Sequence, residues 1–588
     1  MDYFDEYILN NAVPVTNESI NYRNMYLNVM ETSIAAYDFN DIDEKINFPI
    51  YDFQDIFMGY SRIGMTRLLS VMAFLMKEGM LKEVDDFWAR LMNAVLDDIL
   101  KEHLKSGVEF LILEVCTALY VLGPDIDYYS VYIEKLKTIN PYDQYDSTLM
   151  KKPKEELYNF CMYGICAEYL RGLLTGEDTD DFIQKHWDVQ KSRFNSDGRY
   201  MDPGCPMVYD ITSRYRLALM LGLGYKGSVS GEMKEVLTKG SYNLLFQMSS
   251  DYKFPYGGRS NQFNFNECLA ASMFEFYSTG FFKRGDPVTA GVFRYNAVKS
   301  VDGLSQWLNA KPARHIKNMY PIGSSYGIDS YGTYERYMGT MGTFLSGAVL
   351  FMNESIPLYK IPDSIGSYVL SEQNEFHKIF ASAGGYSVEI DPAADSKYDS
   401  SGLGRLHFQE APAELALSMP FASSPKYLLG KFSNDKARSL CPYWTFEGNR
   451  EYLSESKYSY KVKHVVETLG QVAFTVEYSI KNRGKINEEY NIDDSGVLIQ
   501  CSSDYADISY CVPVFQSNGM DESVILHDEK DCSITLGGWA YKVVWTDSVK
   551  SEFRDYLLYN RNGVYSELNL VNKKKTIKIK LTIKRREE

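Results

Sequence analysis

The sequence predicts an α+β multidomain chain, with an N-terminal (α/α) toroid of about six helical hairpins followed by a C-terminal antiparallel β-sandwich. Three observations predict this fold class. Apolar residues recur at helical spacing from about residue 20 to residue 352, turn-forming residues concentrate in 353–375, and period-two patterns follow from 376 to 588. The predicted domains are therefore 1–352 and 376–588, joined by the linker 353–375.

The helical half contains nine strong helical patterns and three weaker ones. The strong patterns span Ser61–Met80, Lys82–His103, Val108–Leu122, Glu155–Leu174, Asp210–Gly222, Glu232–Met248, Asn261–Thr279, Thr289–Leu308 and Tyr334–Phe351, and the weaker ones lie near Ile20–Tyr37, Tyr128–Ile139 and Asp180–Arg193. The segment from Ile63 to Met76 is apolar nearly all round, which indicates burial between two layers of helices. About twelve antiparallel helices can close into a ring of hairpins.

The second half shows alternating apolar and polar residues in short runs. The runs are Tyr458–Val465, Gln471–Ile480, Val497–Cys501, Ser533–Leu536, Tyr541–Trp545 and Thr576–Ile583. Turns such as Lys481–Gly484 join them. Many short strands separated by turns are typical of an antiparallel β-sandwich.

Composition and charge exclude several classes of function. The net charge is −16, and no Lys/Arg-rich tract precedes the last twenty residues, which argues against a nucleic-acid partner. The basic residues from Lys573 to Arg586 alternate with Ile and Leu, as on the solvated face of a terminal strand. No apolar run reaches the length of a membrane span, and Met1–Glu6 shows no signal peptide.

The cysteines and the absence of nucleotide or zinc motifs narrow the chemistry further. Nine cysteines are scattered without a C-x-x-C pair, which fits reduced thiols and a cytoplasmic location better than disulfides or a zinc site. The sequence has no P-loop, no Rossmann glycine fingerprint and no H-E-x-x-H helix. We therefore expect no cofactor and no metal.

Three polar, aromatic loops interrupt the helical half, and the first is the most informative stretch of the chain. They are Asp197–Asp210, Phe254–Ser260 and Pro321–Arg336. Pro and Gly fix turns, so these are shaped loops. Tyrosine is abundant, with 47 residues, and it offers both an apolar face for a sugar and a hydroxyl. Packing in a large core explains that abundance equally well. We expect the loops to form the rim of one binding cleft.

The order of short motifs resembles a known group of proteins. Arg62 lies in an early helix, Asn159 opens a middle helix, Asp197 to Asp210 has the form D-G-x-x-x-D-G/P-x-x-x-Y-D, and Pro255 to Ser260 resembles P-[FY]-G-R-S. The turn carries an extra glycine at Gly257–Gly258, and no Trp flanks Asn159. The segment Tyr398–Phe408 is also similar.

These motifs resemble bacterial carbohydrate-active enzymes that join an (α/α) toroid to an antiparallel β domain, including heparinase-like polysaccharide lyases and toroidal glucuronidases. The closest likeness is to a largely uncharacterised family grouped with the glucuronidases. The resemblance implies that the helical domain is catalytic and that the substrate is a uronic-acid-containing oligosaccharide.

A uronic acid carries a carboxylate, and arginine's planar fork suits it. Arg259 is the first choice, since its glycine-containing turn allows close approach to a ligand, although it could instead tie down its own turn. Arg62, Arg336 and Arg405 are further candidates, and a solvated arginine is the default for Arg336 and Arg405. The other predicted substrate contacts are Asn159, Tyr209, Ser260, Tyr326 and Tyr331.

Hydrolysis of a glycosidic bond requires two carboxyl groups, one acid and one base or nucleophile. The loops and the helix starts beside them offer Asp202, Asp210, Glu267, Asp329 and Glu335. We expect Asp202 or Asp210 to act with Glu335. Asp210 could instead cap the following helix, and Glu267 could be a buried, paired carboxylate.

β-Elimination requires different groups. A neutralised uronate carboxylate acidifies the adjacent C–H, and a Tyr or His removes that proton. Tyr334 and His407 are the catalytic candidates, with Tyr209, Tyr326 and Tyr331 as further tyrosines on the loops. His407 could equally be a strand histidine on a half-buried face, and His315 is expected to be solvated.

The leading prediction is a glycoside hydrolase of the glucuronidase type. A lyase that cleaves uronates by β-elimination is the alternative within the same substrate class, and a non-catalytic carbohydrate-binding protein is the alternative from another class. The sequence leaves the formation of a homo-oligomer open.

Overall fold

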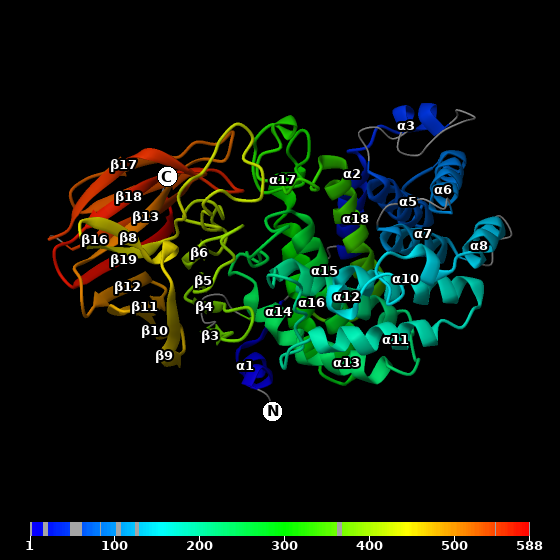
Figure 1. Cartoon of the computed structure of the whole chain (residues 1–588), viewed down its shortest axis with the longest axis horizontal. Coiled ribbons are helices and arrows are strands. Elements are labelled where there is room, and N and C mark those ends of the chain that lie inside the picture. The colour runs from blue at the N-terminus through cyan, green and yellow to red at the C-terminus, as the bar shows by residue number, and fades with distance from the viewer. Residues whose placement is uncertain are drawn as a thin grey trace.

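The structure is a computed structural model, and it describes residues 3–15, 21–46, 61–82, 84–100, 107–123, 129–361, 367–546 and 548–586. Parts of three predicted helices, at residues 20, 101–103 and 128, lie outside the described residues, as do 362–366 of the predicted linker. The helices occupy one half of the molecule and most strands the other (Figure 1).

Six helices form a closed inner ring within the described part of the chain. They are α5 (Arg62–Lys77), α7 (Val108–Leu122), α10 (Asn159–Thr175), α12 (Met207–Gly222), α15 (Phe265–Lys283) and α18 (Tyr334–Phe351). Each packs against the next, and α18 returns to α5. Most of their residues are buried on every side, because other helices cover them from outside.

The outer helices complete the toroid. They are α2 (Tyr22–Ile34), α6 (Asp85–Ile99), α8 (Ser130–Lys137), α11 (Asp180–Gln190), α13 (Ser230–Lys239), α14 (Ser241–Gln247) and α16 (Pro287–Asp302). Four further helices are α1 (Tyr3–Asn11), α3 (Phe39–Ile46), α9 (Pro141–Gln144) and α17 (Ser305–Leu308). The predicted helix Glu232–Met248 divides at Gly240 into α13 and α14. The predicted helix Thr289–Leu308 divides at Gly303 in the same way.

Two antiparallel sheets form the β-sandwich. The eight-stranded sheet has the order β14 (Val524–His527), β15 (Asp531–Leu536), β16 (Trp539–Trp545), β19 (Thr576–Arg585), β12 (Gly496–Ser503), β11 (Gly484–Asp493), β10 (Gln471–Ile480) and β9 (Tyr458–Thr468). The five-stranded sheet has the order β17 (Lys550–Tyr559), β18 (Val564–Val571), β13 (Ile508–Ser517), β7 (Cys441–Phe446) and β8 (Asn449–Tyr452). Alternate residues of β10 are buried in one continuous apolar core.

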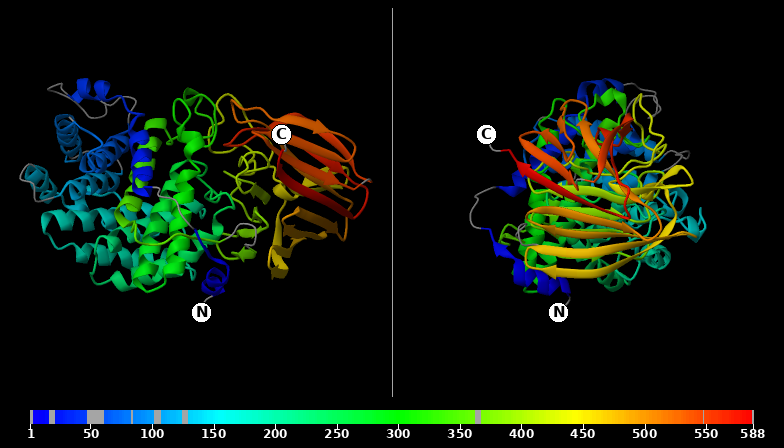
Figure 2. Two further views of the ribbon diagram at one scale, coloured as in Figure 1. Left: turned by 180° about the vertical axis from the view of Figure 1, so that it is seen from behind. Right: turned by 90° about the vertical axis from the view of Figure 1, so that its left-hand side faces the viewer.

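A third sheet lies between the sandwich and the helices (Figures 1 and 2). Its strands are β3 (Tyr368–Ser371), β4 (Ile379–Ala383), β5 (Tyr386–Asp391) and β6 (Gly402–Phe408). The strands β4 and β5 are buried along their whole length. A two-stranded ladder of β1 (Val13–Pro14) and β2 (Tyr359–Lys360) ties the N-terminal segment to the end of the toroid.

The predicted fold class, a helical toroid followed by an antiparallel β-sandwich, is confirmed. The predicted linker 353–375 contains the strands β2 and β3. Among the described residues, no helix combines the length and the apolar character needed to cross a membrane.

Candidate active site

A cavity of about 390 Å³ lies at the N-terminal end of the inner ring. Residues from the first two turns of all six inner helices line it, together with two of the predicted loops. The lining residues are Arg67, Phe110, Asn159, Phe160, Tyr163, Val208, Tyr209, Thr212, Arg259, Ser260, Phe265, Tyr331, Arg336, Tyr337, Thr340 and Phe344. We call this cavity the cleft. Six of the predicted substrate contacts lie in it, namely Asn159, Tyr209, Arg259, Ser260, Tyr331 and Arg336.

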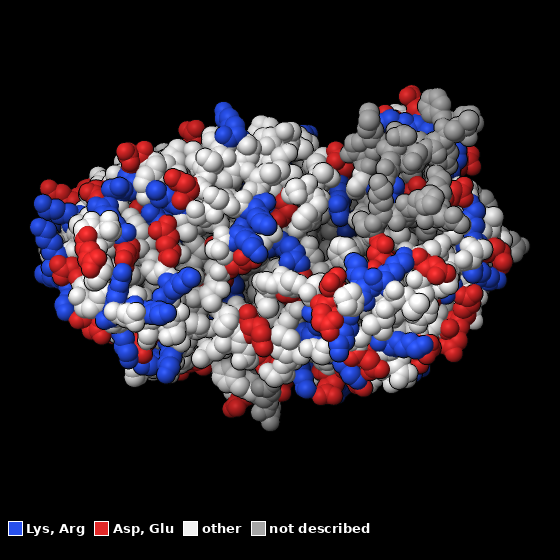
Figure 3. Space-filling model, in the orientation of Figure 1, with Lys and Arg blue, Asp and Glu red and all other residues white. Residues whose placement is uncertain are grey.

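The cleft is electropositive for two reasons. Unpaired backbone N–H groups and helix dipoles favour anions at helix N-termini, and the six inner helices all begin on this side. In addition, Arg67, Arg259 and Arg336 line the cleft, whereas no Asp or Glu of the described residues does. Figure 3 shows Lys and Arg side chains beside a hollow over the region of α15 and α18. The cleft therefore suits an anionic ligand.

Ser260 is the centre of a cluster of tyrosine hydroxyls. Its Oγ lies 3.2 Å from the hydroxyl of Tyr209, 3.1 Å from that of Tyr331 and 3.4 Å from that of Tyr337. Burial raises the pKa of Tyr331 and that of Tyr337, so both hydroxyls keep their protons at neutral pH. The cluster can exchange protons because each of its hydroxyls can both donate and accept.

Two glycines allow the Ser260 turn to lie directly on the start of α12. Gly257 and Gly258 have φ values of +141° and +73°, and the Gly257 carbonyl accepts a hydrogen bond from the backbone N–H of Met207 at 3.2 Å. A Cβ at position 258 would lie 2.7 Å from Cβ of Pro206. The extra glycine of this turn therefore has a steric reason.

Arg259 is partly neutralised by Asp202. Its guanidinium forms an ion pair with the buried Asp202 carboxylate and donates to the Pro203 carbonyl at 2.9 Å. It also lies 4.4 Å from the centre of the Tyr209 ring. The second oxygen of Asp202 accepts from Nδ2 of Asn159 at 2.8 Å. Because both oxygens are occupied, Asp202 orients the side chains of Asn159 and Arg259, and it does not line the cleft itself.

Arg67 and Arg336 carry the less compensated charges of the cleft. Among the described residues Arg336 forms no ion pair, and Nε of both arginines is buried without a hydrogen-bond partner. Burial lowers the pKa of Arg67, and the nearby Arg336 cation lowers it further. Arg67 donates to Oγ1 of Thr340 at 2.5 Å and to the Arg336 carbonyl at 3.3 Å. The buried Glu114 carboxylate partly compensates the positive charge of Arg67. The hydrogen bonds that this carboxylate accepts come from Ser70 and Thr343 and not from Arg67.

The structure places Asp210 in a buried network and not in the cleft. Both of its oxygens accept from Arg214, at 2.9 Å each. They also accept from the Tyr200 backbone N–H at 2.8 Å and from Nε of Arg199 at 3.0 Å. The side chain is fully buried and does not cap α12, whose N-cap residue is Pro206. Four hydrogen bonds make Asp210 a structural carboxylate that braces the Asp197–Asp210 loop.

Three predicted residues of the early and late helices lie beside the cleft without lining it. Arg62 forms an ion pair with Asp98 at 3.0 Å. The ring of Tyr334 packs edge-on against His315, at 5.3 Å between centroids. Glu335 lies in the first turn of α18, and its carbonyl accepts from the Tyr37 hydroxyl at 2.8 Å. Among the described residues, neither the predicted substrate contact Arg62 nor the predicted catalytic residues Tyr334 and Glu335 line the cleft.

Three further predicted residues lie at or within the contact between the two domains. Arg405 is buried and donates to the carbonyls of Ser418 and Phe254 at 3.0 and 2.8 Å. His407 is buried between the hydroxyls of Ser249 and Ser418, at 3.1 and 3.0 Å, and burial lowers its pKa well below the usual value.

The third, Tyr326, donates to the Gly563 carbonyl at 2.9 Å and stacks on Tyr320. The arrangement makes Tyr326, Arg405 and His407 structural.

The other polar residues that the sequence singled out are also paired or buried. Glu267 forms a buried ion pair with Lys317 at 2.8 Å, as one of its two predicted alternatives states. His315 was expected to be solvated, but it is buried, which lowers its pKa to about 3. Asp329 accepts a hydrogen bond from the backbone N–H of Ser260 at 3.1 Å and so helps to fix the turn that carries Ser260.

Sequence reasoning missed Arg67, Tyr163 and Tyr337 as residues of the cleft. All three lie on inner helices whose apolar neighbours made them look like core residues. The available signal was their place in the first two turns of α5, α10 and α18, since the start of each inner helix faces the cleft.

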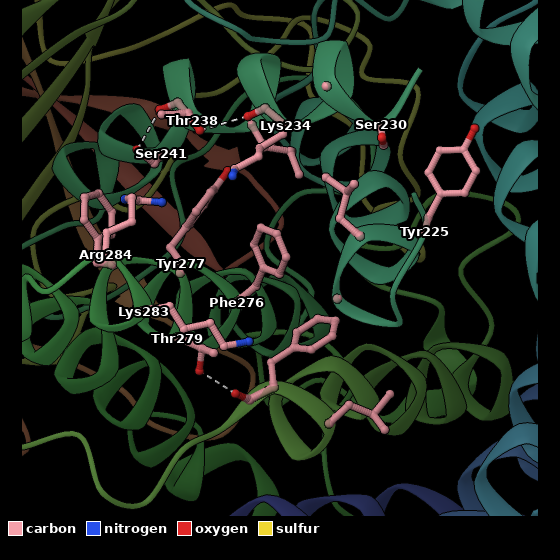
Figure 4. Close-up of a pocket in the computed structure, with 18 residues that line it drawn as sticks. Tyr225, Ser230, Lys234, Thr238, Ser241, Phe276, Tyr277, Thr279, Lys283 and Arg284 are labelled. Atoms are coloured by element: carbon pink, nitrogen blue, oxygen red, sulfur yellow. Dashed lines mark hydrogen bonds between the residues drawn. The ribbon is translucent and has the colours of Figure 1, made fainter. Parts of the chain in front are cut away.

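A second cavity, of about 620 Å³, lies at the opposite end of the inner helices. The C-terminal parts of α12, α15 and α18 line it, together with α13. Figure 4 shows Lys234 and Lys283 on opposite sides of Phe276 and Tyr277. None of the predicted site residues lies there, and its lysines are exposed, so we place the candidate active site in the cleft.

No protein-family model and no curated protein matches the sequence. Solved structures do match the fold. Heparinase III matches over 99% of this chain and 88% of its own, with a TM-score of 0.52 and 10% sequence identity. The chain shares the fold of heparinase III.

Other solved structures also match the fold. A mutant of the heparan sulfate lyase HepC from Pedobacter heparinus matches 97% of this chain and 84% of its own, with a TM-score of 0.46 and 10% identity. A mutant of unsaturated glucuronyl hydrolase from Streptococcus agalactiae matches 58% of this chain and 98% of its own, with a TM-score of 0.32 and 13% identity. The predicted resemblance to toroid-plus-sandwich carbohydrate-active enzymes is confirmed at the level of the fold.

Proposed function

We propose that the protein is a lyase that cleaves uronic-acid-containing saccharides by β-elimination. One observation carries the proposal. The cleft combines three arginines, an asparagine and four tyrosines, and none of its described lining residues is an Asp or Glu. A glycosidase requires two carboxyl groups beside the scissile bond, whereas β-elimination requires a neutralised uronate and proton-transferring hydroxyls.

The arginines bind and neutralise the uronate carboxylate in this proposal. Arg336 and Arg67 are the best placed, because their charges are the least compensated in the cleft and a carboxylate would relieve their mutual repulsion. Asn159, held by Asp202, adds a carbonyl oxygen that has no hydrogen-bond partner among the described residues and can accept from a sugar hydroxyl. Neutralising the carboxylate makes the adjacent C–H more acidic.

The tyrosine cluster moves the protons. Tyr209 is the proposed base, because its hydroxyl contacts Oγ of Ser260 at 3.2 Å and the Arg259 cation lies 4.4 Å from the centre of its ring. It removes the proton from the carbon next to the carboxylate. The bond between the neighbouring carbon and the glycosidic oxygen then breaks, leaving a carbon–carbon double bond. Tyr337 or Tyr331, whose protons are retained by burial, protonates the leaving oxygen.

Hydrolysis of a glucuronide, the leading prediction from the resemblance and from the acidic residues of the loops, is the second candidate. Asp202 supports it, because this carboxylate directly contacts the cleft residues Asn159 and Arg259. It ranks second because both oxygens of Asp202 are engaged and no second carboxylate of the described residues lines the cleft. A cytoplasmic location and the oligomeric state remain predictions from the sequence.

A panel of uronic-acid-containing polysaccharides and oligosaccharides tests the proposal. We expect new ultraviolet absorbance from the unsaturated uronate that elimination leaves at the non-reducing end. Free uronic acid without absorbance would favour the hydrolase instead. Binding of these saccharides without any product would favour a non-catalytic carbohydrate-binding protein.

A further inference from the structure

A loop of the β-sandwich contacts residues that hold the Ser260 turn. Residues Asn560 to Gly563 connect β17 to β18, and all four are buried. Each of them has a hydrogen bond that leaves its own hairpin. Because the loop comes more than 200 residues after the toroid, these contacts are not a consequence of chain connectivity.

Arg561 forms the central contact of this loop. Its guanidinium is fully buried and binds Asp329 with two hydrogen bonds, of 2.9 and 3.1 Å. It also donates to the Gly327 carbonyl at 2.8 Å and lies 4.3 Å from the centre of the Tyr427 ring. A bidentate ion pair of this kind fixes both partners in one geometry.

Asp329 links Arg561 to Ser260. The oxygen that accepts from Nη1 of Arg561 also accepts from the backbone N–H of Ser260 at 3.1 Å. Ser260 has a φ of +60°, which a residue with a Cβ adopts only when its surroundings impose it. The Asp329 hydrogen bond is one such constraint, and the position of Ser260 Oγ among the three tyrosine hydroxyls depends on it.

Two asparagines, Asn562 of the loop and Asn318 of the toroid, add hydrogen bonds between the loop and the toroid. Nδ2 of Asn562 donates to the Lys317 carbonyl at 3.0 Å and to Oε1 of Gln262 at 3.3 Å. Gln262 lies two residues after Ser260 and also has a positive φ, of +66°. Nδ2 of Asn318 donates to the Arg561 carbonyl at 2.9 Å. The loop therefore reaches the Ser260 turn directly at Gln262 and, through Asp329, at Ser260.

Stabilisation of the contact between the two domains does not by itself explain the buried ion pair of Arg561 and Asp329. Removing two charges from water costs free energy that their attraction often does not recover, and apolar residues of similar volume can replace such a pair without loss of stability. A fixed geometry is what the pair adds here.

We infer that the β17–β18 loop is part of the active-site construction and that Arg561 is a positioning residue, which acts through Asp329 on Ser260. The catalytic part of this inference rests on the proposed function. The structural part does not, and it is tested separately.

Amide hydrogen exchange of the full chain tests the structural part. Arg561→Lys cannot form the bidentate pair, so amides of residues 258–262 should exchange roughly fivefold faster or more, the factor expected for one weakened hydrogen bond. Asp329→Asn should do the same. Arg438→Lys is the matched control, because Arg438 is also a buried arginine of the β-sandwich, paired with Glu567 at 2.7 Å and remote in its contacts from the turn. Unchanged exchange at 258–262 in Arg561→Lys would overturn the inference.

Steady-state kinetics tests the catalytic part. At a temperature where all variants are folded, kcat of Arg561→Lys should fall roughly tenfold to a hundredfold, as expected for a displaced reacting group, with a smaller change in KM. Arg438→Lys should lose thermal stability but keep its kcat. If Arg561→Lys keeps the wild-type kcat on a substrate that the wild type cleaves, the positioning role is wrong and the proposed function stands. If the wild type cleaves no uronate, the proposed function fails and the exchange experiment still decides the structural part.

Discussion

Ser260 combines an unfavourable backbone conformation with three hydroxyl contacts. A φ of +60° costs of the order of 1 kcal/mol or more for a residue with a Cβ. The turn retains this conformation through the hydrogen bond from the Ser260 N–H to Asp329 and the contacts of its Oγ with Tyr209, Tyr331 and Tyr337. Such strain concentrates at sites where a side chain must be held in one place.

Tyr209 is the first residue to test. Tyr209→Phe removes the proposed base but keeps the ring under Arg259, so kcat should fall by about 10²–10⁴-fold, the range for a lost general base. KM should change less, since the ring contact is retained. The thermal stability should stay close to that of the wild type. Tyr163→Phe serves as a control, because Tyr163 lines the cleft without touching Ser260. Wild-type kcat in Tyr209→Phe would remove Tyr209 from the mechanism.

Arg336 is the second residue to test. Arg336→Gln should raise KM and lower kcat/KM roughly tenfold to a hundredfold for uronate substrates, the cost of about 1.5–3 kcal/mol for a charged hydrogen bond. Stability should not fall, because the variant relieves the repulsion of Arg67. Arg284→Gln, at the opposite cavity, is the control for lost positive charge. An unchanged kcat/KM would place the uronate carboxylate elsewhere.

The sequence predicts some residues of the site and misassigns others, and the difference between the two groups has a physical reason. Asn159, Tyr209 and Arg259 lie at helix starts or on a glycine turn, where local sequence fixes which side faces the cleft. Asp210 and His407 looked equally suitable, but Asp210 is engaged by Arg199, Tyr200 and Arg214 of its own loop and helix. A partner of His407 comes from a distant segment. Ser249, which contacts His407, is 158 residues away in the chain. Pairing of this kind is invisible in a single sequence.

At the scale of elements, the inner helices both form the scaffold of the cleft and contribute to its positive charge. Their apolar faces close the ring, and their N-termini point partial positive charge at one end of it. Predicted and observed boundaries of α5, α7, α12 and α18 differ by three residues or fewer, because a long apolar periodicity is a strong signal. Gly240 and Gly303 divided two predicted helices, since glycine weakens a helix interior.

The connection between β5 and β6 adds a pH-dependent contact to the Ser260 turn. Oδ2 of Asp399 accepts from the Gly258 N–H at 2.6 Å, and burial raises the pKa of this carboxyl to about 7. In the unfolded chain the pKa of Asp is about 3.9. Between about pH 4 and about pH 7 the folded state therefore binds more protons at Asp399 than the unfolded state does, and its contribution to stability falls as pH rises.

Asp399→Asn should remove this dependence. Asn keeps an oxygen for the Gly258 N–H and cannot ionise, so the variant should gain stability relative to the wild type as pH rises from about 4 to about 7, by up to about 1.4 kcal/mol per pH unit. Above that range the difference should become constant. Denaturant midpoints of both proteins across this range measure it. Two parallel pH profiles would show that Asp399 does not titrate there.

At the scale of the whole molecule, the site depends on both domains. The toroid supplies the lining of the cleft, the β-sandwich supplies Arg561, and the β5–β6 connection of the third sheet supplies Asp399. Arg561, through Asp329, and Asp399 hold the turn that carries Ser260. The alternating patterns of the second half predicted its strands but not this role. The loop that connects β17 and β18 contains no apolar pattern, and its contacts join residues more than 200 positions apart.

The masses of the reaction products test the central claim most directly. A uronate oligosaccharide would be incubated with the protein in water enriched in heavy oxygen, and all products would be weighed by mass spectrometry. Elimination adds no water, so we predict that the product masses sum to the substrate mass and that no heavy oxygen enters. A summed mass larger by one water, with heavy oxygen in the new reducing end, would contradict the account and show a glycoside hydrolase.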